Sequence, residues 1–355
     1  MILQEVIEMI KAGIVGATGY AGQELLRLLT QHSECEVKYI TSRSYVDQRF
    51  SSVFGNFVKI VDDACIEKEM IELAKEVDVL FIALPHGIAS ANVNKDLLSM
   101  TKVIDLGADY RLEDIEIYDK WYKTVHNSAD LLQEAVYGLC ELNRDKIKPA
   151  RLIANPGCYT TCSILGLTPL LKEGLIDKNS IIIDAKSGVS GAGRGLDIGI
   201  HYSECNESIK AYKLASHRHT PEIEQELSHA AGEEVTITFT PHLVPMNRGI
   251  LVTAYATLND FYSYEHIKNA YEKHYRDEYF VRLLPEGVFP ETKWVKGSNF
   301  CDINFQVDER TNRIIVVAAI DNLIKGAAGQ AIQNMNIVFG LDEKKGLEYI
   351  PMFPA

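Results

Sequence analysis

The feature that most constrains the fold is a glycine-rich turn that joins an apolar stretch to a helical pattern near the N-terminus. The sequence runs from AGIV (12–15) directly into GATGYAG (16–22) and then into QELLRLLTQ (23–31). Glycines let a backbone turn tightly and approach a pyrophosphate, whose charge the amides and the dipole of a helix N-terminus stabilise. The spacing is GxxGxxG with a further glycine at Gly13, rather than the commoner GxGxxG. A glycine turn without a ligand is the alternative, but the strand before it and the helix after it favour a dinucleotide site.

The residues after the second apolar run indicate which dinucleotide this site would take. VKYIT (37–41) is followed by Ser42, Arg43 and Ser44, with no acidic residue to hold the ribose 2′-hydroxyl of NAD. Hydroxyls and a guanidinium suit a 2′-phosphate, so the sequence predicts NADP(H); Arg43 as a solvated loop cation is the alternative. The loop LPHG (84–87) ends the next run, and its His86 could line the cofactor pocket or bond to backbone. The cofactor residues expected in this half of the chain are Gly16, Thr18, Gly19, Tyr20, Ala21, Gly22, Ser42, Arg43 and Pro85.

The pattern of apolar runs changes near residue 155 and predicts two domains in a chain of 355 residues. The runs before it alternate with helical patterns, which is typical of a parallel sheet covered on both faces: 12–15, 37–41, 77–84 and 101–107. The runs after it are longer and several alternate in polarity, which indicates a mixed or antiparallel sheet: 180–186, 234–243, 249–258, 299–308 and 313–321. We therefore expect an α/β protein with a Rossmann-type doubly wound domain at 1–155 and an α+β catalytic and oligomerisation domain at 156–325. The C-terminal segment of about 326–355 is expected to pack back on the first domain.

Composition excludes several classes of protein. A net charge of −13 repels phosphate backbones, so a nucleic-acid partner is not expected. No apolar run approaches the roughly 18 to 20 residues of a membrane span, and Gln4, Glu5 and Glu8 interrupt what a signal peptide would keep apolar, so a cytoplasmic protein is expected. Seven cysteines without a CxxC pair argue against a disulfide framework and a zinc site, which leaves individual thiols for chemistry.

One of these cysteines lies where a helix begins. In NPGCYTTC (155–162) a strand-like run ends, Pro156 and Gly157 turn the chain, and apolar residues from Cys158 to Lys172 have helical spacing. The amides and dipole of a first helical turn favour the thiolate, which is the reactive form of cysteine. Cys158 is therefore either a nucleophile or a small packed residue, and Cys162, one turn deeper, is expected to be buried and inert.

A partner that moves protons is available in HRHTPEI (217–223), where His217 and His219 flank Arg218 ahead of a helix start at Thr220. Two residues apart in an extended segment, the imidazoles would share a face. A metal site would need two more ligands, and none with suitable spacing stands out. A purely structural loop is the other alternative.

Two further loops have anion-friendly sequences. KSGVSGAGR (186–194) follows a strand with small residues between two cations, and DNLIKGAAGQ (321–330) opens the last helix. Either could instead be a mobile surface loop. The residues assigned to the cofactor here are Ser187, Gly188, Gly191 and Asn322.

Taken together, these motifs resemble those of the N-acetyl-gamma-glutamyl-phosphate reductase family, and the resemblance runs nearly end to end. The nine motifs that carry it, in order, are GATGYAG (16–22), ALPHG (83–87), IDLGADYRL (104–112), YGLCELNR (137–144), ANPGCY (154–159), SGVSGAGR (187–194), HRHTPEI (217–223), PHLVPMNRGI (241–250) and DNLIKGAAGQA (321–331). A looser resemblance to aspartate-semialdehyde dehydrogenase covers the glycine turn, the cysteine and the KGAA segment, without that family's QNC context. The chain departs from the usual signature at Thr160, Thr161, Cys162 and Cys140, which puts local packing in question more than activity.

The resemblance implies NADPH-dependent reductive dephosphorylation of N-acetyl-L-glutamyl 5-phosphate to N-acetyl-L-glutamate 5-semialdehyde, a step of arginine biosynthesis. It implies that Cys158 forms a thioester, which accepts hydride where a carboxylate would not. His219 is the expected acid/base and His217 a substrate or oxyanion contact, although the two roles could be exchanged. The residues expected to bind the acyl phosphate are Arg111, Asn155, Arg194, Tyr212 and Arg218.

The family also implies a homodimer or homotetramer, and it leaves two alternatives open. One is a related reductase that acts on an aminoadipate-type acyl phosphate in lysine biosynthesis. The other is a catalytically silent NADP-binding regulator on the same fold, which would need neither Cys158 nor the two histidines.

Overall fold

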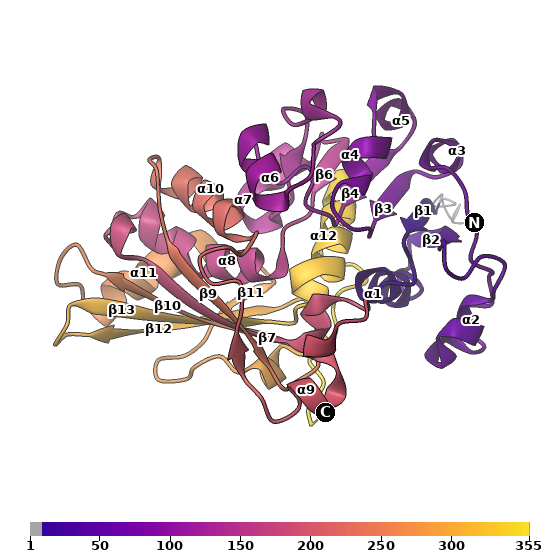
Figure 1. Cartoon of the computed structure of the whole chain (residues 1–355). Coiled ribbons are helices and arrows are strands. Elements are labelled where there is room, and N and C mark those ends of the chain that lie inside the picture. Colours follow the sequence, from indigo (N-terminus) through magenta and orange to yellow (C-terminus); the bar gives the residue numbers. More distant parts are fainter. Residues whose placement is uncertain (1–8, 355) are drawn as a thin grey trace, which may run out of the picture. The chain divides into compact units, whose positions relative to one another are not determined.

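The computed structural model describes residues 9–354, and these form two compact units (Figure 1). The first unit contains the described residues up to Glu113 together with Val125–Asn155 and Ala331–Leu347; the second contains Asp114–Thr124, Pro156–Gln330 and the described residues from Glu348 onward. The first unit thus takes part of the C-terminal segment, and the second takes a short piece of the N-terminal half. Residues 1–8, which supplied the argument against a signal peptide, lie outside the described residues.

The first unit is built on a six-stranded sheet in the order β2-β1-β3-β4-β6-β5, and every neighbouring pair is parallel. Its strands are β1 (Ile10–Val15), β2 (Cys35–Thr41), β3 (Val79–Ile82), β4 (Lys102–Asp105), β5 (Val136–Tyr137) and β6 (Leu152–Ala154). Side chains along β3 are buried throughout, as expected for a strand covered on both faces. The prediction of a doubly wound parallel sheet is confirmed.

The helices of the first unit follow its strands. They are α1 (Tyr20–Leu29), α2 (Phe50–Val53), α3 (Met70–Ala74), α4 (Ile88–Asn92), α5 (Lys95–Met100), α7 (Cys140–Ile147) and, from Ala331 onward, α12 (Gly329–Val338), with short 3-10 turns η1 (Gly55–Phe57) and η2 (Ala129–Leu131). Helix α1 buries Leu25, Leu26 and Leu29, which form the apolar stripe that its sequence predicted. It begins at Tyr20, inside the glycine motif, so the glycine turn leads directly into a helix N-terminus.

The second unit is built on a seven-stranded mixed sheet in the order β11-β12-β13-β10-β7-β9-β8. Its strands are β7 (Ile182–Gly188), β8 (Lys210–Ala211), β9 (Thr238–Val244), β10 (Ile250–Thr257), β11 (Val281–Leu283), β12 (Cys301–Asp308) and β13 (Arg313–Ile320). The central run from β12 through β13 and β10 to β7 is antiparallel, whereas β11 with β12 and β7 with β9 are parallel. The expected mixed sheet is therefore confirmed.

One helix forms the core of the second unit. Helix α8 (Cys158–Lys172) packs on β10 and β13, and it is buried from Tyr159 to Leu171. Helices α10 (Thr220–Ala231) and α11 (Tyr264–Tyr275) pack against it in turn. The unit also contains two further α-helices, α6 (Ile115–Tyr122) and α9 (Tyr202–Cys205). Its short helical turns are η3 (Lys178–Ser180), η4 (Val189–Ala192), η5 (Ile198–Ile200), η6 (Thr292–Trp294) and the π-helical η7 (Ile324–Ala328). Strand β10 alternates buried and half-buried residues, so a single face of the sheet takes the helices.

Two element boundaries differ from the sequence expectation for identifiable reasons. The run at 234–243 joins the sheet only at Thr238, because the amide of Ile237 donates to the Glu224 carboxylate (3.1 Å) instead of to a strand. The segment 321–330 was expected to open the last helix directly, but the π-helical turn η7 occupies Ile324–Ala328, and α12 begins only at Gly329. Within residues 9–354, no helix is long and apolar enough to cross a membrane.

Candidate active site

The glycine turn of the first unit is packed so closely that side chains are excluded from it. Gly16 has a φ of +87°, and a Cβ placed on it would lie 2.6 Å from the carbonyl oxygen of Ala83. A Cβ on Gly22 would lie 2.3 Å from the carbonyl oxygen of Gly16, so α1 sits directly against the turn. Gly19 caps α1 with extended backbone, and Tyr20 and Ala21, half-exposed, form its first turn. This is the backbone cradle that a pyrophosphate at a helix N-terminus requires.

The end of β2 is tied to the same turn by hydroxyl contacts. Thr18 Oγ1 and Ser42 Oγ lie 2.9 Å apart, and the amide of Gly16 donates to Thr41 Oγ1 at 3.2 Å. Gly16, Ser42 and the exposed Arg43 line one pocket. Backbone, hydroxyls and a guanidinium are thus brought together at one pocket, and Gly16, Ser42 and Arg43 are the predicted cofactor residues that line it.

Sequence reasoning missed several other residues of this pocket, among them Lys68, Asn92 and the acidic Glu67 and Glu69. Lys68 Nζ is held 2.6 Å from Glu76 Oε1. No sequence motif marks these residues, since they reach the pocket only through the folding of the parallel sheet. Pro85 lies exposed in the loop after β3, and His86 beside it is half-buried.

Arg111 and Asn155 are both buried in the first unit and contact each other. Arg111 donates from Nε to the carbonyl of Asn155 and from Nη2 to the carbonyl of Leu106, both at 2.8 Å. The Asn155 side chain accepts from Asn334 Nδ2 of α12 at 3.2 Å. These contacts hold the backbone at the ends of β4 and β6.

In the second unit, Cys158 is the first residue of α8 and Gly157 is its cap, so the predicted helix start is confirmed. The fully buried carboxylate of Glu222, from α10, accepts the amide of Gly157 and the hydroxyl of Thr160, both at 2.9 Å. Glu222 therefore fixes the first turn of α8 to the helix that follows the two histidines. Cys158 is half-buried, and Cys162 is fully buried, as predicted.

A row of hydrogen-bonding groups connects His217 to β9. Tyr159 donates to the carbonyl of His242 at 3.0 Å, Tyr212 donates to the Tyr159 hydroxyl at 3.3 Å, and Tyr212 lies 3.4 Å from His217 Nε2. His217 Nδ1 accepts the backbone amide of His219 at 3.1 Å. Because Nδ1 is an acceptor, the proton of neutral His217 lies on Nε2, which donates to Tyr212. All the donors in this row then point the same way.

The environment of these groups keeps them uncharged. Burial, followed by the repulsion of His219, lowers the pKa of His217 to about 2. Burial raises the pKa of Tyr212 to about 12, with a further contribution from the Cys158 thiol, and burial also raises the pKa of Tyr159. The negative charge of a Cys158 thiolate thus helps to raise the pKa of both phenols, and both stay protonated.

His219 differs from His217 in its surroundings. It is half-buried, caps α10, and its ring centre lies 4.8 Å from that of His217 and 5.9 Å from that of Tyr159. Arg218 between them turns away and lies over the Tyr122 ring at 5.4 Å. Across residues 9–354, no group of three or more His, Cys, Asp or Glu side chains is arranged to hold a metal ion.

The two glycine-containing loops of the second unit meet each other. Asn322 accepts the amide of Gly249 at 2.7 Å and donates to Ser190 Oγ at 3.0 Å. A Cβ on Gly188 would lie 2.6 Å from the Asn247 carbonyl, and one on Gly191 would lie 3.0 Å from Ser187 Oγ. The four predicted residues thus form a second close-packed cluster, whereas Arg194 is exposed at its margin.

Comparison with known proteins assigns both units to one family. Residues 11–150 match the family described as semialdehyde dehydrogenase, NAD binding domain, and residues 158–322 match the semialdehyde dehydrogenase, dimerisation domain. Among solved structures, aspartate semialdehyde dehydrogenase II complexed with ASA from Vibrio cholerae has a TM-score of 0.69 at 16% identity, covering 94% of this chain and 99% of that one. The enzyme with NADP from Candida albicans has a TM-score of 0.66 at 17% identity, with the same coverage. At this level of identity, the two solved structures show a similarity of fold alone.

Curated relatives are much closer in sequence. The N-acetyl-gamma-glutamyl-phosphate reductase of Lachnoclostridium phytofermentans is 59% identical over 346 residues, which is 98% of this chain and 100% of that protein. The protein of the same name from Campylobacter jejuni subsp. jejuni is 55% identical over 341 residues, 96% of this chain and 98% of the relative. At this identity and coverage, the chain belongs to the N-acetyl-gamma-glutamyl-phosphate reductase family of semialdehyde dehydrogenases.

Proposed function

We propose that this chain reduces N-acetyl-L-glutamyl 5-phosphate to N-acetyl-L-glutamate 5-semialdehyde with NADPH, a step of arginine biosynthesis. The observation that carries the proposal is the placement of Cys158 at the start of a buried helix, next in the chain to Tyr159, which contacts Tyr212 and both histidines. Relatives above 50% identity that bear the reductase name support the choice of substrate.

Cys158 is the proposed nucleophile and His219 its acid/base. His219 takes the thiol proton, and the thiolate attacks the acyl carbon of the substrate. The carbon–oxygen bond to phosphate then breaks, and His219 returns its proton to the departing phosphate, which leaves a thioester on Cys158. NADPH, when bound, supplies the hydride that reduces this thioester. The resulting tetrahedral oxyanion collapses to aldehyde and expels the Cys158 thiolate. Because the departing phosphate has taken the proton, solvent returns one to His219 before the next acyl phosphate is attacked.

His217 and Tyr212 are proposed to stabilise the oxyanion. His217 carries no charge and has its proton on Nε2, so it would donate to the substrate oxygen in place of its long contact with Tyr212 (3.4 Å), without competing with His219 for the proton. The amides of the first turn of α8 lie ahead of the helix's own hydrogen-bond ladder and would add donors to the same oxyanion. Neutral donors that need no rearrangement are the most effective stabilisers of developing charge.

We propose cofactor contacts for two groups of residues. Gly16, Thr18, Gly19, Tyr20, Ala21 and Gly22 would take the pyrophosphate; Ser42 and Arg43 would take the 2′-phosphate; Pro85, Ser187, Gly188, Gly191 and Asn322 would complete the contacts. The close-packed glycines of both groups support this assignment. We accordingly propose 1–155 as the NADP-binding domain, joined by part of about 326–355, and 156–325 as the catalytic and oligomerisation domain.

The anionic ends of the substrate would be received by cationic and polar side chains. Arg194 is exposed beside the Ser187 cluster, and Arg218 is next to both histidines in the chain, so these two are the stronger candidates for phosphate and carboxylate. Tyr212 is a further candidate, because its hydroxyl lies 3.4 Å from His217 Nε2. Arg111 and Asn155 are also proposed to bind the substrate. Several of their polar groups already hydrogen-bond within the protein, so other atoms of these residues would make the substrate contacts.

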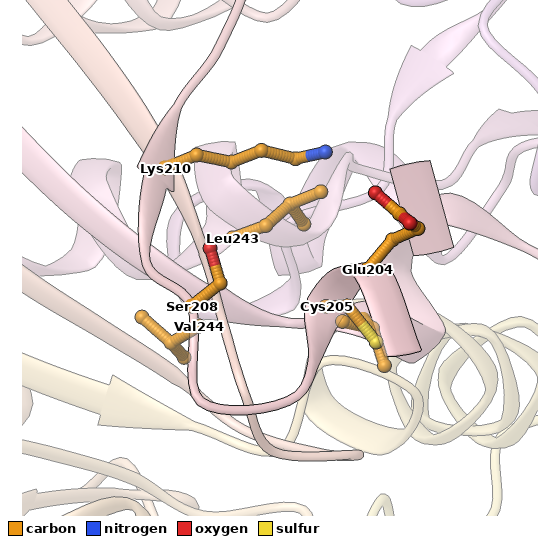
Figure 2. Close-up of a pocket in the computed structure, with 7 residues that line it drawn as sticks. Glu204, Cys205, Ser208, Lys210, Leu243 and Val244 are labelled. Carbon is orange, nitrogen blue, oxygen red and sulfur yellow. The ribbon is translucent and has the colours of Figure 1, made fainter. Parts of the chain in front are cut away.

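We propose a homodimer or homotetramer whose contacts use the segment 196–214. Five large apolar side chains there are at least 60% exposed: Leu196, Ile198, Tyr202, Ile209 and Leu214. The segment is held to the sheet, because Lys210 pairs with Leu243 of β9 and its Nζ donates to the Gly199 carbonyl. Glu204, Cys205 and Ser208 of the same segment line one pocket together with Leu243 and Val244 (Figure 2). An ordered apolar surface of this kind is typical of a protein interface, and the matched dimerisation domain, 158–322, supports a second copy as its partner.

None of the seven cysteines forms a disulfide, which supports a cytoplasmic location.

The activity can be tested in the direction that forms NADPH. Purified protein with N-acetylglutamate 5-semialdehyde, phosphate and NADP+ should show the rise of NADPH absorbance, and Cys158→Ser should show none. If the wild type is inactive here but active with the aminoadipate analogue, the substrate assignment is wrong. If neither substrate reacts, the reductase proposal fails.

A further inference from the structure

We propose that the π-helical turn η7 (Ile324–Ala328) fixes the position of the Cys158 side chain, and that Gly326 and Asp321 are its positioning residues. The inference rests on the proposed function, because it concerns the same nucleophile. All the residues involved belong to the second unit. No motif in the sequence predicts this contact between the last helical segment and α8.

Gly326 lies directly against Cys158. A Cβ on Gly326 would be 2.7 Å from Cys158 Cβ and 3.1 Å from Cys158 Cα, closer than real Cβ contacts allow. Neither of those atoms can rotate away, since one is backbone and the other is the first atom of the side chain. The φ of Gly326 is not positive, so space and not backbone conformation is what requires glycine here.

The π-helical geometry is what brings a glycine to this place. The amide of Gly326 donates to the carbonyl of Asp321 at 3.0 Å, and the amide of Ala328 donates to that of Leu323 at 2.9 Å, both across five residues. Lys325 and Ala328 of the same turn are fully buried, so the turn cannot rotate to present another residue without displacing them. Turns of this type are uncommon and occur often at functional sites.

Asp321 holds the turn in this form. Its Oδ1 accepts the amides of Leu323 (2.9 Å) and Ile324 (3.1 Å), and its Oδ2 accepts the amide of Gly297 (2.9 Å). Arg248 Nε lies 3.2 Å from Oδ2, and the carboxylate is fully buried. A buried carboxylate with this many donors is costly to disturb, so the wide turn and its contact with Cys158 are rigid.

Gly166 provides a matched control, because it lies in α8, the helix that begins with Cys158. Gly166 of α8 also faces a packed surface, but a Cβ there would lie 3.5 Å from Val316 and 3.7 Å from Ala318, which is ordinary contact. Gly166→Ala therefore adds a methyl group to α8 without moving its N-terminus. Gly326→Ala adds the same methyl group at a place where Cys158 must move by several tenths of an ångström.

The test compares Gly326→Ala with Gly166→Ala and the wild type. We measure kcat, the Kd for NADPH, the thermal unfolding midpoint, and the rate at which iodoacetamide alkylates the peptide that contains Cys158, read by mass spectrometry. Gly326→Ala should lower kcat by about 10- to 100-fold, because misplacing a reacting atom by up to 1 Å has that cost. Alkylation of Cys158 should slow by about tenfold as the thiol is displaced relative to the amides of the first turn of α8, which favour the reactive thiolate. The Kd for NADPH should stay within twofold, and Gly166→Ala should match the wild type in kcat and in the alkylation rate.

If Gly326→Ala has the same alkylation rate at Cys158 and the same kcat as the wild type, the proposal is overturned. Alkylation needs neither substrate nor cofactor, so a slower rate in Gly326→Ala supports positioning even if the reductase activity fails. If Gly326→Ala does not fold, Asp321→Asn is used, which keeps an oxygen for the amides of Leu323 and Ile324 but removes the charge that faces Arg248. It should slow alkylation and lower kcat in the same direction, and an unchanged alkylation rate in that variant would equally overturn the proposal.

Discussion

Acidification should reduce the stability of this protein at one identifiable side chain, the imidazole of His217. The side chain is 8% exposed, its Nδ1 accepts the amide of His219, and its pKa is lowered to about 2 by burial and then by the repulsion of His219. A proton added to Nδ1 would face a backbone N–H that already points at it. The unfolded chain has no such constraint, so its His217 titrates near the ordinary value of 6.5.

The size of the effect follows from the two pKa values. Because the folded pKa is lowered, the unfolded state binds the proton more readily, and stability is lost as the pH falls through 6.5. Between pH 7.5 and pH 5.5 the loss is about 1.4 kcal/mol, close to the limit of one proton per pH unit below 6.5. Asp105 acts in the opposite sense, since burial raises its pKa to about 7 and the folded state holds its proton more tightly. The pH dependence of the wild type alone therefore mixes the two signs.

A difference between variants isolates His217. In His217→Asn the side-chain oxygen can accept the amide of His219 without a titrating group, and His266→Asn removes an exposed histidine as the control. Urea unfolding at pH 7.5 and pH 5.5 should show the wild type and His266→Asn losing about 1.4 kcal/mol more than His217→Asn. Parallel losses in all three proteins would refute the assignment of a neutral His217.

Three other changes test separate parts of the molecule. Arg43→Ala should weaken NADPH binding by about tenfold and leave NADH binding nearly unchanged, as for the loss of one charged phosphate contact; equal losses in fluorescence titration would exclude the 2′-phosphate role. Cys162→Ala should keep kcat within about twofold and lose about 1 kcal/mol of stability, because its thiol is buried away from the reacting atoms. Leu196→Asp with Ile198→Asp should convert the oligomer to smaller species in sedimentation velocity, and an unchanged sedimentation coefficient would place the interface elsewhere.

Much of the fold could be predicted because apolar pattern and sheet type are linked by burial. β3 is apolar throughout since helices cover both of its faces, and β10 alternates since helices cover one. The strands that were missed, β5, β8 and β11, have two or three residues each, too few to show a period. Their existence depends on partners elsewhere in the sheet, which the local sequence does not encode.

The candidate site was predictable only where its chemistry is local. Cys158 could be placed at a helix start from the Pro-Gly pair and the apolar spacing after it. Glu222, which holds that start, is 65 residues away and is identified only by the packing of α10 on α8. Gly326 is further still, and its motif reads equally well as an anion site. Residues that position a nucleophile act through packing, so they carry no signature of their own.

The two histidines show most clearly what geometry adds to sequence. In HxH the imidazoles are equivalent, but one backbone amide, that of His219, points at Nδ1 of His217 and at once fixes its tautomer and opposes its protonation. Only His219 is then left to exchange protons, so the variants should fail differently. His219→Asn should lower kcat by about 10²- to 10⁴-fold and remove one limb of the pH–rate profile, as for the loss of an acid/base. His217→Asn should lower kcat by at most about 10³-fold, as for the loss of an oxyanion donor, and keep both limbs. If the limb disappears in His217→Asn instead, the roles are exchanged and the tautomer inferred from the amide contact does not govern catalysis.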